Sequence, residues 1–293
     1  MVGKSGFVER NLKYIFPLPA LIFVFLLMIF PVCYTLFLSF TDWRLTVPRP
    51  RRFVGLDSYL VILQHPRFHM AFLRTLAFTA GAVALQAVLG TIIALILHRE
   101  FMGKSVLKLI MLLPLVVTPV AIGIVFQLFF DPTIGFLNFV LNSLGLPQSG
   151  WVTDARTVIP SLILVDVWQW TPMIALIVLA GLTSLSPEPY ESARVDGANS
   201  VQIFFRVTLP MIMPTVITAI VLRSVDALKT YDIIAAMTRG GPGFASETLN
   251  IMAFTWSFLY LSFGQSSAIL VMFFFLILFC SLGIMHLRKK FET

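Results

Sequence analysis

The side chains in this sequence that are best suited to chemistry are four charges set inside or beside long apolar stretches. They are Asp166, Arg223, Asp226 and Lys229. Asp226 lies three residues after Arg223 and three before Lys229, so a helix would carry all three on one face. Ionisable groups in lipid are costly unless they pair, so Asp166 is expected to pair with Arg223. The signs nearly cancel, which suits an uncharged ligand.

Aromatic and acidic side chains accompany these charges, and with them they complete a candidate substrate pathway. They are Trp168, Trp170, Tyr231 and Asp232. Charged groups offer hydrogen bonds to a polar ligand, and the flat rings can stack on its apolar face. In the alternative interpretation, the charges only hold two helices together and the tryptophans form a belt at the membrane surface. The sequence leaves both interpretations open.

The elements that must position these residues are membrane-spanning helices. The chain has 293 residues, of which 58% are hydrophobic and 12% charged, against about 45–50% and about 25% in soluble domains. About 20 apolar residues cross the hydrocarbon of a bilayer as a helix. We therefore expect an all-α polytopic membrane protein with a cytoplasmic segment 1–14 and a single membrane domain 15–293. The six predicted transmembrane helices cover residues 15–41, 75–97, 109–130, 158–182, 207–232 and 266–286, with a short external helix before the last.

Depth supports a charge cluster between the fourth and fifth spans. If span four enters at Val158 from outside, Asp166 lies roughly 12 Å below the outer surface. If span five leaves at Asp232, Arg223 and Asp226 lie roughly 13 and 9 Å below the same surface. The charges would share one level.

Lysine and arginine are more frequent in the segments that are internal if the N-terminus is cytoplasmic, so both termini are expected in the cytoplasm and the protein in the inner membrane. The first outer loop weakens this bias, because it also holds arginines such as Arg44, Arg49, Arg51 and Arg52. The net charge of +7 indicates topology and contact with lipid headgroups rather than binding to nucleic acid.

Several kinds of site are not expected. Cys33 and Cys280 fall inside predicted spans, and the four histidines are scattered without metal-ligand spacing, so no disulfide, metal site or catalytic site is predicted. Residues 98–105, HREFMGKS, end like a phosphate-binding loop but have His98 where glycine is required. No cofactor or nucleotide site of the chain's own is expected, and if the protein is driven by ATP, a partner must bind and hydrolyse it with Mg²⁺.

Small and ring-locked residues mark where helices pack or bend. Span two carries Ala77, Gly81, Gly90 and Ala94, a pattern that lets helices approach closely. Prolines in spans three and five invite kinks because each removes a backbone donor; they are Pro114, Pro119 and Pro214.

The loop at residues 186–210 is predicted to be a cytoplasmic helix-turn-helix. Ser186 is a suitable N-cap and Pro187 a suitable first residue, followed by Glu188 and Glu191 where the helix dipole favours anions. Gly197 can end this helix in the left-handed conformation, and Asn199 or Ser200 can cap a second helix that runs towards Pro210.

This loop resembles the signature of the inner-membrane permeases of ABC importers. The matching positions are Glu191-Ser192-Ala193, then Gly197, then Val207-Thr208-Leu209-Pro210, with Ser192 and Val207 as conservative departures. The resemblance implies that the loop contacts a separate ATPase. The residues that it assigns to this coupling are Glu191, Ala193, Asp196, Gly197, Leu209 and Pro210.

A second resemblance, at Lys229 to Pro242, is to the maltose-transporter-like carbohydrate branch of these permeases. It implies a complex with a second permease subunit, as a heterodimer, two cytoplasmic ATPase subunits and an extracytoplasmic solute-binding protein. The substrate would be a mono- or oligosaccharide or a related polyol or glycoside, whose hydroxyls and apolar ring face suit the charges and aromatic rings. The alternatives are a permease for a non-sugar solute such as a glycerol-phosphate compound, a secondary transporter, for which no inverted repeat is evident, or a membrane enzyme.

Overall fold

The computed structural model describes residue 11 and residues 13–289, with side chains to residue 286, and this part of the chain is almost entirely helical. Most of the predicted cytoplasmic segment 1–14 lies outside the described residues, as does Lys290 at the other end. Five described helices are long and apolar enough to cross a membrane, or six if one bent pair counts as a span. The chain divides into two compact units, residues 1–65 with 253–272 and residues 66–252 with 273–293.

The first unit begins with an apolar helix over Lys13–Ser39 that buries almost none of its side chains within the chain. It comprises α2 (Leu18–Val24), a π-helical turn η1 (Phe25–Ile29) and α3 (Phe30–Ser39). The unit also holds α4 (Asp57–Gln64), the π-helical turn η3 (Thr255–Leu259) and the start of α15 (Phe263–Lys289).

Part of the arginine-rich first loop is internally paired. Arg49 lies 2.7 Å from a carboxylate oxygen of Asp42, and the Arg44 guanidinium donates to Gln265 Oε1 at 3.0 Å. The loop chain passes so close to α15 that a Cβ on Gly264 would lie 2.0 Å from the Thr41 carbonyl oxygen. These contacts give two of the loop's arginines side-chain partners within the unit.

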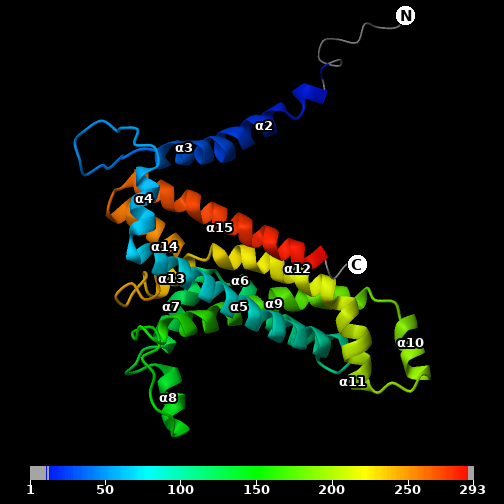
Figure 1. Ribbon diagram of the computed structural model, residues 1–293. Helices are drawn as coiled ribbons and strands as arrows, with labels where there is room; N and C mark the ends of the chain where they lie inside the picture. Colours follow the sequence, from blue (N-terminus) through cyan, green and yellow to red (C-terminus); the bar gives the residue numbers. More distant parts are fainter. Residues whose placement is uncertain (1–10, 12, 290–293) are drawn as a thin grey trace, which may run out of the picture. The chain divides into compact units, whose positions relative to one another are not determined.

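The second unit contains the remaining helices. In chain order they are α5 (Pro66–His98), α6 (Lys104–Val116), α7 (Pro119–Phe129), α8 (Phe136–Ser143), α9 (Val158–Thr183), α10 (Glu188–Val195), α11 (Ser200–Ile203), the π-helical turn η2 (Phe204–Thr208), α12 (Leu209–Leu228), α13 (Asp232–Met237), α14 (Leu249–Phe254) and the rest of α15. Helices α5, α9 and α12 run side by side (Figure 1) and contact one another.

Glycines of α5 let it approach α9 closely, as the small-residue pattern predicts. A Cβ on Gly81 would lie 2.8 Å from Ile163, and one on Gly90 would lie 2.8 Å from Ile174 and 3.1 Å from the Ala175 backbone nitrogen. Ala94 continues this contact in a buried cluster with Ile174.

The third predicted span is not one helix. α6 and α7 meet at a bend of 98°, with Val117 and Thr118 between them in extended conformation (ψ 137° and 141°). The residue before a proline is pushed out of the helical region, so Pro119 explains the extended Thr118. The predicted kink is therefore a break.

The fifth span also differs from its predicted limits. Ser200–Leu228 is a continuous helical stretch of 29 residues, so the second helix of the 186–210 loop continues past Pro210 instead of ending near it. The π-helical turn η2 directly precedes α12, where Pro210 occupies the first turn; a wider turn accommodates a residue that has no N–H to donate. The helix then ends at Leu228, before the predicted limit of residue 232.

Candidate functional site

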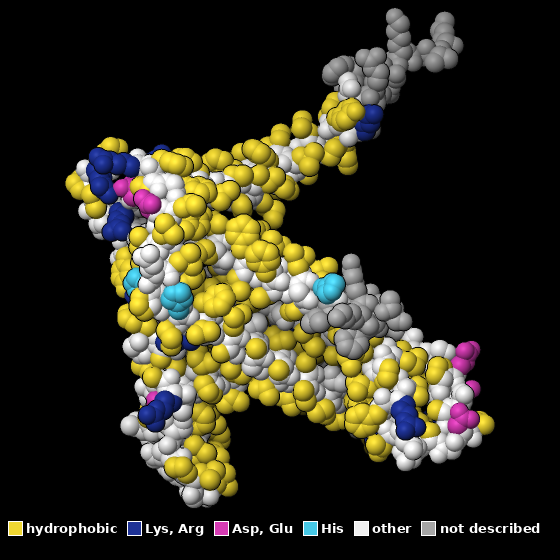
Figure 2. Space-filling model, viewed as in Figure 1, with side chains coloured by type: hydrophobic (Ala, Val, Ile, Leu, Met, Phe, Trp, Pro, Cys, Tyr) yellow, Lys and Arg dark blue, Asp and Glu magenta, His cyan; other side chains and the backbone are white. Residues whose placement is uncertain are grey.

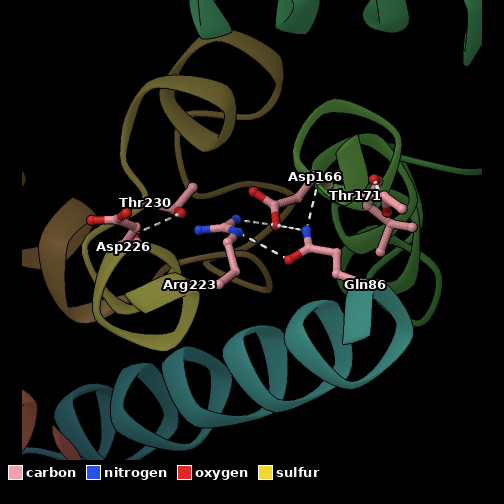
Figure 3. A network of polar contacts seen from close by, with 7 residues as sticks. Gln86, Asp166, Thr171, Arg223, Asp226 and Thr230 are labelled. Carbon is pink, nitrogen blue, oxygen red and sulfur yellow. Dashed lines mark hydrogen bonds and ion pairs between the residues drawn. The ribbon is translucent and has the colours of Figure 1, made fainter. Parts of the chain in front are cut away.

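A buried ion pair links the second, fourth and fifth spans. Arg223 on α12 lies 2.5 Å from Asp166 Oδ2 on α9, and their side chains are 1% and 0% exposed. Gln86 on α5 completes a triangle, because its Oε1 accepts from Arg223 Nε at 2.9 Å and its Nε2 donates to Asp166 Oδ2 at 2.8 Å (Figure 3). The expected pairing of Asp166 with Arg223 is confirmed. Each charge has the partner that burial demands.

Asp226 and Lys229 form a separate, exposed pair. Lys229 Nζ lies 3.3 Å from Asp226 Oδ1, and each side chain is about half exposed. Although Asp226 is three residues from Arg223, Arg223 is buried at the helix interface, whereas Asp226 is half exposed and points away from Asp166 (Figure 3). The three charges predicted to share one face are thus divided between a buried pair and a surface pair.

A cavity of about 390 Å³ opens beside these pairs. Most of the predicted pathway residues line it, together with residues at the start of α7, just after α12 and in α13. Its lining is Pro119, Trp170, Arg223, Asp226, Lys229, Thr230, Tyr231, Asp232 and Ile233. The Arg223 guanidinium carbon lies 5.2 Å from the centre of the Trp170 ring, which is within cation–π range.

Two predicted pathway residues do not line this cavity. Asp166 is held behind Arg223 with no exposed surface. Trp168 lies two residues from Trp170, is half exposed, and packs against Phe126 with ring centres 5.3 Å apart. The two tryptophans therefore have different surroundings.

The structure adds Gln86, Gln169 and Pro119 to the site. Gln169 on α9 is buried, and its Nε2 donates to the Val117 carbonyl oxygen at 3.2 Å, where the break between α6 and α7 removes the helical partner. Gln86 is the one amide side chain in the predicted second span, a signal that could have been followed from the sequence. Because Pro119 begins α7, the break brings the start of that helix to the cavity.

The other candidate site is the turn between α10 and α11, at the far end of α9. Ser186 Oγ accepts from the Glu188 backbone N–H at 3.4 Å, while Pro187, predicted as the first helical residue, occupies the N-cap. Gly197 is left-handed (φ 77°), as predicted. The Gly197 N–H donates to the Arg194 carbonyl and the Ala198 N–H to the Ala193 carbonyl, which together form a Schellman motif.

A capping box follows immediately. The Asn199 side chain accepts from the Gln202 backbone, and the Gln202 side chain accepts from the Asn199 backbone, both at 2.9 Å. Of the residues assigned to coupling, Glu191 lies in the first turn of α10, Ala193 and Asp196 near its end, and Leu209 and Pro210 at the start of α12. The turn also exposes apolar side chains, with Val195 88% and Val201 65% exposed.

No cluster of three or more His, Cys, Asp or Glu side chains with the geometry to hold a metal ion occurs among the described residues.

The described residues form an almost entirely helical protein whose long apolar helices are joined by a buried ion pair. Residues 86–291 match the family described as "Binding-protein-dependent transport system inner membrane component", and the chain belongs to this family. It is therefore a permease subunit of an ABC importer.

Relatives span nearly the whole chain. The trehalose/maltose transport system permease protein MalF of Thermococcus litoralis is 33% identical over 98% of this chain and 96% of its own. The trehalose transport system permease protein SugA of Mycobacterium tuberculosis is 31% identical over 92% of this chain and 86% of its own. A subunit of a bacterial alginate ABC transporter, solved with an alginate-pentasaccharide-bound periplasmic protein, superposes with a TM-score of 0.83 at 21% identity, covering 97% of this chain and 96% of its own. At 21% identity this similarity shows that the two chains share a fold, and no more than that.

Proposed function

We propose that this chain forms half of the pathway through which an ATP-driven importer moves a carbohydrate, and that its α10–α11 turn docks on a cytoplasmic ATPase. A second, different permease subunit would supply the other half, two ATPase subunits would bind the paired turns, and an extracytoplasmic binding protein would deliver the sugar. Both termini are then cytoplasmic. ATP and Mg²⁺ would be bound by the ATPase partner.

The observation that carries the coupling role is the exposed apolar surface on a rigid turn. Val195 and Val201 flank the Schellman motif and the capping box and project from a segment with its own hydrogen-bonded frame. An apolar patch on a polar segment outside the membrane marks a contact surface for another protein. The family match supports a partner of this kind.

The carbohydrate role is supported by the cavity lining and by the relatives. Trp170 and Tyr231 offer flat ring faces, while Asp226, Lys229 and Thr230 offer hydrogen-bond partners at half-exposed positions. Arg223 is paired with Asp166 and Lys229 with Asp226, so Asp232 is the one lining carboxylate outside these pairs and the charges nearly cancel, which suits an uncharged polyhydroxyl ligand. The relatives from Thermococcus litoralis and Mycobacterium tuberculosis are named for trehalose and maltose transport.

The coupling role is tested by Gly197→Val in the assembled importer. Valine is strained in the left-handed conformation by about 1–2 kcal/mol, and nothing lies within 4 Å of the added Cβ, so the damage should stay in the turn. We expect sugar-dependent transport to fall while the subunit still inserts and assembles.

Gly103→Val is the matched control. Gly103 is also left-handed (φ 86°), also has nothing within 4 Å, and caps α6 rather than the turn. Equal loss of transport in both variants, or normal coupling in Gly197→Val, would contradict the docking assignment.

A further inference from the structure

The segment between α7 and α9 has an exposed apolar surface that takes no part in the proposed transport pathway. Ile134, Phe139 and Leu144 are 84%, 67% and 68% exposed, and Phe136 and Leu146 are exposed beside them. Figure 2 shows hydrophobic side chains gathered along this part of the molecule. Single exposed apolar residues are common, but a group gathered on one short helix and the residues that flank it indicates a binding surface.

The base of this segment is rigidly built. Asn138, which is buried, donates to the carbonyls of Pro132 and Ser149 and accepts from the Trp151 ring N–H at 2.8 Å. Trp151 in turn stacks on Phe130 with ring centres 5.0 Å apart. Because a Cβ on Gly135 would lie 2.3 Å from the Asp131 carbonyl oxygen, the chain passes close to itself here. The apolar side chains are therefore held in place by a folded support.

The surface continues the exposed apolar surface of α7. Leu128 and Phe129, in the last turn of α7, are exposed and apolar, as membrane-facing side chains are. The Phe129 ring lies 6.0 Å from the Phe136 ring at the start of α8. In Figure 1, α8 extends from the end of α7 across the direction of α5 and α9, which is the direction of a helix lying along a membrane surface.

Charge favours lipid over an aqueous protein partner. Residues 132–153 contain no Asp, Glu, Lys or Arg, whereas Asp154 and Arg156 follow immediately before α9. A surface that docked a soluble protein would be expected to have a polar, hydrated rim.

We propose that α8 and its flanking residues 134–146 lie in the membrane interface, with Ile134, Phe139 and Leu144 inserted among the acyl chains. This lipid-facing anchor lies at the end of α9 opposite the α10–α11 turn. It would fix the depth of the loop that joins α7 to α9, and hence of the nearby cavity.

Spin-label accessibility in the assembled importer in lipid nanodiscs tests this proposal. With Cys33→Ala and Cys280→Ala as background, Phe139→Cys carries the label, and Ala155→Cys, between Asp154 and Arg156, is the control. We expect the label at position 139 to be accessible to oxygen, which partitions into lipid. The same label should be inaccessible to a water-soluble nickel chelate. Position 155 should show the reverse.

Accessibility of position 139 to the nickel chelate would overturn the proposal. Exclusion of both reagents would also overturn it, because the helix would then be covered by protein. Protection that arises only when the binding protein is added would assign the surface to that partner instead.

Discussion

Arg223 and Asp166 face each other from two different helices, and neither side chain is more than 1% exposed. Removing one partner from a buried pair costs about 3–5 kcal/mol because the other charge is left uncompensated. Arg223→Gln should therefore lower the thermal stability of the assembled complex strongly, and Asp166→Asn in the same variant should restore part of it.

A double-mutant cycle on the unfolding midpoint measures this coupling. If the stability losses of the single variants Arg223→Gln and Asp166→Asn simply add in the double variant, the ion pair makes no specific contribution to stability. Sugar-stimulated ATPase activity of the double variant then reports whether the charges have a further role in transport.

The two tryptophans allow a matched test of the cavity. Trp170 lines it and lies against Arg223, whereas Trp168 packs on Phe126 outside it. Trp170→Ala should raise the sugar concentration needed for half-maximal uptake, and Trp168→Ala should leave it nearly unchanged. Similar changes in both variants would instead indicate a general effect on the helix or on an interface belt.

Asp226→Ala separates binding from assembly at the same cavity. Exposed ion pairs contribute about 0–1 kcal/mol, so loss of the half-exposed pair with Lys229 should leave assembly intact. We expect reduced sugar stimulation of ATPase activity with an unchanged basal rate. Unaltered uptake in both Asp226→Ala and Trp170→Ala would remove this cavity from the pathway, and loss of assembly in both would leave the cluster a structural role only.

Two helical glycines should respond oppositely to replacement by alanine, because Gly90 lies in the contact between α5 and α9 whereas Gly283, on α15, has no close neighbour. Gly90→Ala would place its Cβ against Ile174 and a backbone nitrogen, an overpacked contact that costs about 1–3 kcal/mol. Gly283→Ala meets nothing within 4 Å and should be neutral or stabilising by up to about 1 kcal/mol. Unfolding midpoints of the two variants check this, and equal stability would mean that the close approach is relaxed in the membrane.

The turn that supports α8 should be sensitive to acid. The backbone N–H of Ile134, with the hydroxyl and backbone N–H of Thr133, lowers the pKa of Asp131 below its ordinary value of 3.8. A lowered folded pKa means that the stabilisation is complete above the unfolded pKa and is lost as the pH falls through the folded one. The mobility of a label at position 139 should rise in that acidic range. Asp131→Asn, which keeps an acceptor but does not titrate, should abolish the pH dependence, and an unchanged profile would exclude Asp131 as its cause.

Features set by local chemistry were predictable from the sequence. Uncharged runs located the spans, and glycine at position 197 located the end of α10 because its left-handed backbone favours that residue. The Asp166–Arg223 pair followed from depth and from the need of buried charges for partners.

Features that depend on three-dimensional packing were not predictable in the same way. Spacing alone placed Arg223 and Asp226 on one face, but the position of α9 decides that one is buried and the other exposed. Likewise, Pro119 indicated a kink in the third span. A complete break also needs a new hydrogen-bond donor for the Val117 carbonyl oxygen, and Gln169 supplies it from α9. The break reaches the cavity only because α7 packs beside α13.

The continuity of Ser200–Leu228 has a mechanical consequence. The capping box at Asn199 and the ion pair at Arg223 belong to one continuous helical stretch, which changes direction at the π-helical turn η2 (Figure 1). A displacement of the capping box therefore reaches α12 through the bend at η2, where the main chain stays helical. Because Arg223 on α12 is paired with Asp166 on α9, any movement of α12 past α9 must either carry α9 with it or break the ion pair.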